Sequence, residues 1–160
     1  MQKLRNVLTN ILNALAGGSF IMMVALTVWQ VVTRYLLKSP SAWSEELVSY
    51  LFAWMSLLGA SLVTSERGHM NIPIVVDHMG PGLQKGFHIF AEVVAFAFSA
   101  IILLYGGAKI ANLAMGQMTS GLGVPIGIFY VVMPLCGVLN MIYTTLNVIE
   151  ILKGESKGAE

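Results

Sequence analysis

Three ionisable side chains in the sequence have a spacing that brings them onto one face of a helix. Lys85, His88 and Glu92 lie three and four residues apart, in a stretch that is otherwise apolar. An ionisable group inside a membrane-spanning helix is a functional candidate, because its charge is costly in hydrocarbon. Glu92 would lie only about 9 Å deep, however, where it still reaches interfacial water or pairs with a neighbouring helix. We favour this structural role.

His69 is a second candidate for chemistry. It lies in the compact polar segment 65-69, which also contains Arg67. A histidine can bind a metal or relay a proton, but no Cys, Asp or Glu lies beside it at metal-ligand spacing. Contact with phosphate headgroups or with a partner protein is therefore the favoured interpretation of this segment.

Other arrangements of catalytic or redox residues are not apparent in the sequence. The single cysteine, Cys136, excludes a disulfide or a paired-cysteine redox site within one chain, and we interpret it as a small packing residue. We find no facing carboxylates within a span and no serine or cysteine with a histidine and a third partner. Glu92 stands alone as a polar group at depth. We therefore predict that the protein is not an enzyme and has no catalytic residues, cofactor or metal.

The composition indicates a membrane protein. Of the 160 residues, 56% are hydrophobic and 11% are charged, whereas a soluble domain carries about 25% charged residues. The apolar residues form long runs rather than the stripe of a soluble amphipathic helix. The net charge of +1 has no basic cluster of the kind that binds nucleic acid. We predict one all-α integral membrane domain over residues 1-160, surrounded by membrane lipids.

Four transmembrane helices are expected. We place the spans at about 11-32, 47-65, 86-108 and 124-148, and a tail at 149-160. A cleaved signal peptide is the alternative for the first run, because Lys3 and Arg5 precede it. Cleavage at residues 14-16 would leave a long apolar segment at the new N-terminus, which disfavours this alternative. The last span contains Pro134, where we expect a kink.

The entrance of the second span has its own pattern. Ser39 and Pro40 suit an N-cap followed by a proline in the first helical turn, so we expect the helix to begin near Pro40. Aromatic and apolar residues then recur at helical spacing from Trp43 to Trp54. This pattern predicts a short interfacial helix before the second span.

Positively charged residues favour one orientation. With the N-terminus inside, six Lys and Arg residues lie on the cytoplasmic side and three lie outside. The inside set is Lys3, Arg5, Arg67, Lys85, Lys153 and Lys157, and the outside set is Arg34, Lys38 and Lys109. Both termini are therefore expected in the cytoplasm.

The stretch from Arg34 to His69 resembles the small, Q-type membrane subunit of tripartite ATP-independent periplasmic (TRAP) transporters. The residues that carry the resemblance are, in order, Arg34-Tyr35, Ser39-Pro40, Trp43-Ser44-Glu45-Glu46-Leu47, Trp54, Leu58-Gly59-Ala60, Arg67 and His69. Length, the number of spans and Pro81 extend the resemblance over most of the chain. One departure lies after the histidine, where the family usually has an acidic residue and this chain has Pro73, with Asp77 only later.

The resemblance implies a sodium-driven importer in the bacterial inner membrane. In that family a periplasmic substrate-binding protein captures an organic acid, such as a sialic acid or a C4-dicarboxylate, and delivers it to a membrane complex. The large membrane subunit holds the substrate and sodium sites. The small subunit is implied to be a scaffold for the large one and to help dock the binding protein.

The residues predicted to serve structure and partner binding follow from the resemblance and from the spacing. They are Arg34, Trp43, Glu45, Glu46, Trp54, Gly59, Arg67, His69 and Glu92. As a specific hypothesis, Arg34 pairs with Glu45 or Glu46 and positions the first two spans.

Two other functions remain as alternatives. A stand-alone small dimeric transporter would place a carboxylate in the middle of its first span, and this first span has no charge. A structural subunit of another membrane complex would have the same composition as a TRAP subunit. Only the identity of the partner protein that it binds would distinguish the two.

Overall fold

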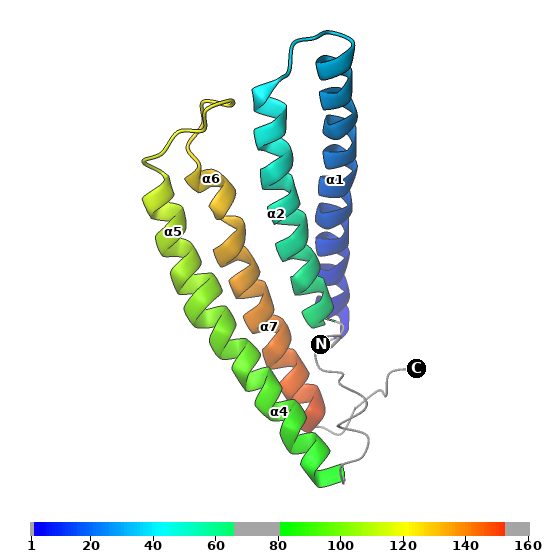
Figure 1. The fold of residues 1–160 in the computed structure, drawn as a ribbon. Coiled ribbons are helices and arrows are strands. Elements are labelled where there is room, and N and C mark those ends of the chain that lie inside the picture. Colours follow the sequence, from blue (N-terminus) through cyan, green and yellow to red (C-terminus); the bar gives the residue numbers. More distant parts are fainter. Residues whose placement is uncertain (1, 66–80, 153–160) are drawn as a thin grey trace.

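The computed structural model describes residues 2–65 and 81–152, and this part of the chain is helical with short connections (Figure 1). Its elements are α1 (Gln2–Tyr35), α2 (Ala42–Ser65), α4 (Pro81–Phe98), the π-helical segment η2 (Ser99–Gly106), α5 (Gly107–Ala114), α6 (Gly127–Tyr130) and α7 (Val132–Leu152). The segments α4, η2 and α5 follow one another without a gap and form one long rod. The predicted all-α class is confirmed for the described residues.

Four candidate membrane spans occur within the described residues. They are Arg5–Tyr35, Ala42–Ser65, Gly82–Ala114 and Gly127–Leu152. At 1.5 Å per residue, the shortest of them, with 24 residues, covers about 36 Å, which exceeds the roughly 30 Å of a hydrocarbon layer. The expectation of four helices long and apolar enough to cross a membrane is thus confirmed.

The helices form two antiparallel pairs. The first pair is α1 with α2, the second is the α4–α5 rod with α6 and α7, and α2 packs against α7 between them (Figure 1). We call the end of the bundle at Gln2, Ser65 and Leu152 the terminal end. The opposite end, with the turn 36–41 and the hairpin 115–126, is the hairpin end. The first and the last described helix therefore begin and finish at the same end.

The start of α2 lies close to the expected position. The helix begins at Ala42, soon after Pro40, and it runs without interruption to Ser65. Between Tyr35 and Ala42 the described chain forms a tight turn, with Lys38 at a positive φ of 53°. Residues 42–46, where we expected a separate interfacial helix, form the first turn of α2 and continue into the span without a break, so no separate interfacial helix is shown in this described segment.

Pro134 explains the interruption between α6 and α7. A proline lacks the backbone N–H, and its ring crowds the carbonyl four residues earlier, which here belongs to Tyr130. The helix breaks at Val131, directly after Tyr130. The expected kink thus takes the form of a break one turn ahead of the proline.

Two glycines allow the second pair to pack closely. A Cβ added to Gly107 would lie 2.8 Å from the Cβ of Met133, and one added to Gly137 would lie 2.8 Å from the backbone nitrogen of Leu104. Neither position has room for a side chain. The π-helical segment η2 and α7 therefore approach each other with backbone near backbone, as small residues permit in membrane bundles.

The apolar core lies where α1, α2 and α7 meet. Its fully buried members are Leu12, Leu58, Val132, Cys136 and Tyr143. The thiol of Cys136 is free and buried, which agrees with its interpretation as a packing residue.

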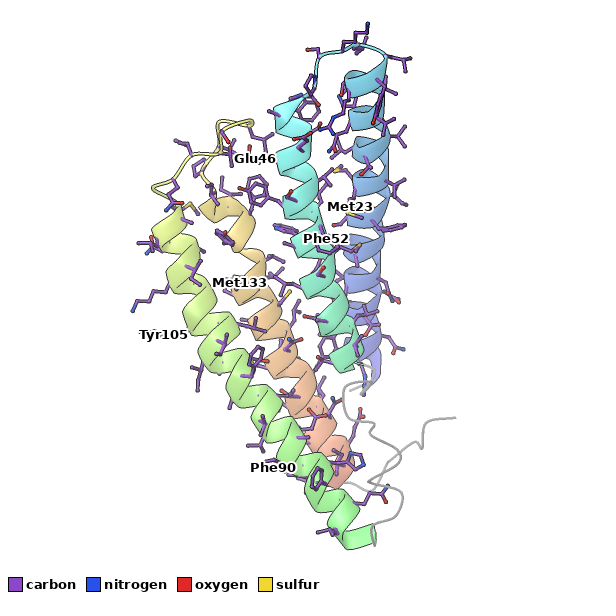
Figure 2. All side chains as sticks on the ribbon, viewed as in Figure 1. Met23, Glu46, Phe52, Phe90, Tyr105 and Met133 are labelled. Carbon is purple, nitrogen blue, oxygen red and sulfur yellow. The ribbon has the colours of Figure 1, made fainter. Side chains whose placement is uncertain are left out.

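Many other large apolar side chains face outward. Examples are Phe52, Phe90 and Tyr105, which are 57%, 64% and 66% exposed (Figure 2). Such a surface is unfavourable in water and matches a lipid environment.

Candidate functional site

Arg34 and Glu45 form an ion pair across the turn between α1 and α2. Arg34 lies in the last turn of α1 and Glu45 in the first turn of α2. Of the two partners expected for Arg34, the structure selects Glu45. The Arg34 side chain is 57% exposed and the Glu45 side chain is 50% exposed. Because the pair is exposed to water, it contributes only about 0–1 kcal/mol to stability.

The neighbouring Glu46 has a different partner. Its carboxylate accepts hydrogen bonds from three successive backbone N–H groups, those of Ser120 at 3.2 Å, Gly121 at 2.8 Å and Leu122 at 3.2 Å. Successive N–H groups that point to one concave spot form an anion site, and here the anion is a side chain of the same protein. Figure 2 shows Glu46 on α2 beside the hairpin. Glu46 thus fixes the hairpin 115–126 to the start of α2.

The hairpin is prepared for this contact by its own backbone. The Thr119 N–H donates to the Val124 carbonyl at 2.9 Å, and the Ile126 N–H donates to the Gln117 carbonyl at 2.9 Å. The Thr119 hydroxyl also accepts from the Val124 N–H at 2.9 Å. These bonds close the loop and turn the N–H groups at its tip toward α2.

Trp43 contacts the hairpin through its backbone. A Cβ added to Gly121 would lie 2.8 Å from the Trp43 nitrogen and Cα, so only glycine fits between them. Trp43 as a whole is 40% exposed. An exposed tryptophan at the end of a span is typical of the membrane–water interface.

Trp54 joins α2 to α6. Its indole N–H donates to the Phe129 carbonyl at 2.8 Å. One turn earlier on α2, the ring of Tyr50 stacks on the ring of Phe129, with centroids 4.0 Å apart and planes 4° from parallel. Together these contacts hold α6 to α2 beside the break at Val131.

Gly59 has no neighbour inside the described chain. A Cβ built on it meets nothing within 4 Å. The structure therefore does not bring Gly59 together with the other candidate residues, and no internal close approach explains a glycine here.

Glu92 is buried inside the bundle, with 1% of its surface exposed. The other two members of its predicted helical face behave differently, because Lys85 is exposed and His88 is half-buried. The three residues share a helix but not an environment. Arg67 and His69 lie outside the described residues.

A polar clamp at the terminal end was missed by sequence reasoning. The Arg5 guanidinium donates to Glu150 at 2.8 Å and to the Ser65 carbonyl, and the Asn147 amide donates to the Thr64 carbonyl at 3.2 Å. The last carbonyls of a helix lack internal partners, so Arg5 and Asn147 cap α2. The available signal was Glu150, an isolated acid directly after a long run without charge.

The expectation that Glu92 is the only polar group at depth is wrong. Other polar side chains in the described helices are less than 9% exposed, among them Ser61, Ser99, Asn140, Thr144 and Asn147. The hydroxyls of Ser61, Ser99 and Thr144 are satisfied by carbonyls of their own helices at 2.8–3.1 Å. Helix-internal bonds of this kind are invisible in a count of formal charges.

The fold and the described contacts define a four-helix membrane component. Among the described residues, the side chains do not form a recognisable catalytic arrangement. Residues 23–154 match the family model described as "Tripartite ATP-independent periplasmic transporters, DctQ component". Because this match covers most of the chain, the protein belongs to that family. It is accordingly the small permease component of a TRAP transporter, a transporter component and not an enzyme, and the family implies the inner membrane.

Three relatives with assigned names are similar to the chain. The sialic acid TRAP transporter small permease protein SiaQ of Vibrio cholerae is 26% identical over 163 residues, covering 99% of this chain and 93% of SiaQ. The C4-dicarboxylate TRAP transporter small permease protein DctQ of Vibrio cholerae is 30% identical over 82 residues, which are 51% of this chain and 35% of DctQ. The sialic acid TRAP transporter permease protein SiaT of Haemophilus influenzae is 27% identical over 92 residues, which are 58% of this chain and only 15% of SiaT.

Proposed function

We propose that this chain acts as a non-catalytic scaffold in a sodium-driven TRAP importer of organic acids. The observation that carries the proposal is the fastening of the bundle at both ends. Glu46 ties the hairpin to α2 at one end, and Arg5 ties α1, α2 and α7 together at the other. A bundle held in this way suits a static frame, against which a larger subunit moves substrate and sodium.

The partners in this proposal are the large TRAP membrane subunit, the periplasmic substrate-binding protein and membrane lipids. Gly59 supports a contact with the large subunit, because its open face on α2 admits another helix closely. The exposed apolar side chains of the outer surface serve contact with the large subunit and with lipid. Substrate and sodium sites are assigned to the large subunit.

The substrate class is an organic acid, with sialic acids and C4-dicarboxylates as the leading candidates. The names of SiaQ and DctQ support both. The two relatives differ in substrate at comparable identity to this chain, so the proposal stops at the class.

We further propose that the terminal end faces the cytoplasm, together with the tail 149-160. The excess of Lys and Arg on that side supports this orientation. The hairpin end then faces the periplasm, where Trp43, Arg34 and Glu45 and the first turn of α2 lie at the interface. The hairpin would be the part of this chain that the binding protein meets.

Co-purification tests the assembly part of the proposal. The tagged chain is expressed with the large permease subunit, extracted in mild detergent and captured on the tag. We expect the large subunit in a fixed ratio to this chain. Recovery of this chain only as a self-dimer, with the large subunit in the unbound fraction, would contradict the proposal.

A further inference from the structure

One face of α7 buries a stripe of polar side chains inside the bundle. Asn140, Tyr143 and Asn147 are 8%, 0% and 1% exposed. Their spacing of three and four residues places them on one side of the helix. Along the helix axis the stripe extends over about 10 Å.

Each of these side chains has a polar atom that the described part of the chain leaves without a hydrogen-bond partner. The atoms are Asn140 Oδ1, the Tyr143 hydroxyl and Asn147 Oδ1. The Asn147 amide nitrogen is occupied by the Thr64 carbonyl at 3.2 Å, which fixes the orientation of the side chain and leaves Oδ1 as the atom to be satisfied. A buried polar atom without a partner destabilises the folded protein. Three such atoms on one face of α7 indicate a ligand that forms hydrogen bonds with all of them.

The chemistry of the three atoms defines that ligand. The two amide oxygens only accept hydrogen bonds, whereas a phenol hydroxyl both donates and accepts. The ligand must therefore donate to the amides and be able to accept from Tyr143. A water molecule does both, and it is stable in a protein interior when it has two to four polar partners.

The surroundings suit water held away from lipid. The ring of Tyr143 belongs to the apolar core together with Leu58 and Cys136, and α2, which packs on α7, contributes two buried hydroxyls. Ser61 and Ser65 are 0% and 1% exposed. Each donates to a carbonyl of its own helix, at 3.1 Å and 2.7 Å, so each oxygen keeps capacity to accept another hydrogen bond.

We propose that α7 holds a short string of ordered water molecules inside the bundle, bound to Asn140, Tyr143 and Asn147. The string lies along the contact between the two helix pairs. The water molecules connect the two helix pairs by hydrogen bonds that can break and re-form. These bonds add to the apolar packing of the core. This inference concerns the interior of the chain and does not depend on the proposed transport role.

Hydroxyl-radical footprinting tests the proposal on the purified chain in lipid nanodiscs. A brief X-ray pulse produces radicals from water, and an ordered water modifies the aromatic ring beside it even where bulk solvent has no access. We expect modification of Tyr143 in spite of its complete burial. Tyr35, which is exposed at the end of α1 beside the turn 36–41, calibrates the dose in the same sample.

Two variants identify the residues that hold the water. Asn140→Leu removes one of the unpartnered atoms and is expected to abolish or strongly reduce the modification of Tyr143, with Tyr35 unchanged. Ser99→Ala is the matched control, since it deletes a buried polar group whose hydroxyl already bonds to the Ala95 carbonyl at 2.8 Å. This control is expected to leave the labelling of Tyr143 as it is. Circular dichroism and gel filtration verify that both variants are folded.

A second readout uses water labelled with heavy oxygen, added just before the pulse. Ordered water exchanges slowly, so Tyr143 should take up the heavy isotope later than Tyr35. Absence of modification at Tyr143 in the unaltered chain would overturn the proposal. So would equal modification in Asn140→Leu, or uptake of the isotope without delay.

Discussion

Glu45 and Glu46 are neighbours in the chain, yet their carboxylates have different surroundings. Glu45 pairs with Arg34 at the surface, where water screens the interaction. Glu46 instead accepts from three backbone N–H groups of the hairpin, and a hydrogen bond that involves a charged group is worth about 1.5–3 kcal/mol. The two residues therefore offer a matched comparison.

We predict that Glu46→Gln lowers the stability of the purified chain by about 1–2 kcal/mol, because the charge and part of the acceptor capacity are lost. Thermal unfolding in detergent measures the effect. Glu45→Gln is the control, with an expected loss of about 0–1 kcal/mol. Equal losses in the two variants would show that the hairpin is not held by Glu46.

The partner of Glu46 also marks a limit of sequence reasoning at this scale. Opposite charge suggested Arg34 as a partner for Glu45 or Glu46, and that expectation found the right residue in Glu45. The N–H groups that bind Glu46 belong to the main chain of residues 120–122, which have no side-chain signature. Only the folded hairpin turns those groups toward α2.

At the scale of the helices, Arg5 is the residue on which three elements converge. Its guanidinium bonds to Glu150 on α7 and to the last carbonyl of α2, and both charged side chains are only 19% exposed. Water and salt screen a partly buried pair of this kind less than an exposed pair, so its loss costs more.

We predict that Arg5→Gln destabilises the chain by about 1–3 kcal/mol, more than Arg34→Gln at the exposed pair. The double variant Arg5→Gln with Glu150→Gln should lose less than the sum of the two single variants, because both remove the same ion pair. A double-mutant cycle from thermal unfolding provides the measurement. Losses that simply add in the cycle would speak against this role of Arg5.

Glycines with and without close neighbours give a second comparison between helices. Gly137 lies against the backbone of Leu104, whereas Gly59 faces open space. We predict that Gly137→Ala destabilises the isolated chain by about 1–3 kcal/mol, since η2 and α7 must move apart. Gly59→Ala should leave the isolated chain unchanged. Loss of stability in Gly59→Ala alone would contradict the assigned packing.

The helices were largely predictable because lipid imposes simple constraints. A backbone in hydrocarbon must satisfy its polar groups internally, so long runs without charge become helices. The orientation of α7 about its axis was not predictable, since it depends on packing against α2 and η2. For this reason the buried face with Asn140 and Asn147 escaped notice. No separate interfacial helix forms before the second span, because residues 42–46 are the first turn of α2 and continue into the span.

At the scale of the whole molecule, two helix pairs are fastened at both ends and meet along α2 and α7. This arrangement suits the scaffold role that we propose. Among the described candidate residues, Arg34, Glu46 and Trp54 join helices or loops of the bundle. Gly59 faces outward, where we propose that a partner binds.

Uptake into sealed proteoliposomes tests the proposed scaffold role of this chain. Vesicles receive this chain, the large permease subunit and the periplasmic binding protein, with each omitted in turn, and sodium-dependent uptake of labelled organic acid is measured. We predict uptake only when all three are present and none with this chain alone. A sodium-dependent flux carried by the purified chain by itself would contradict its role as a scaffold.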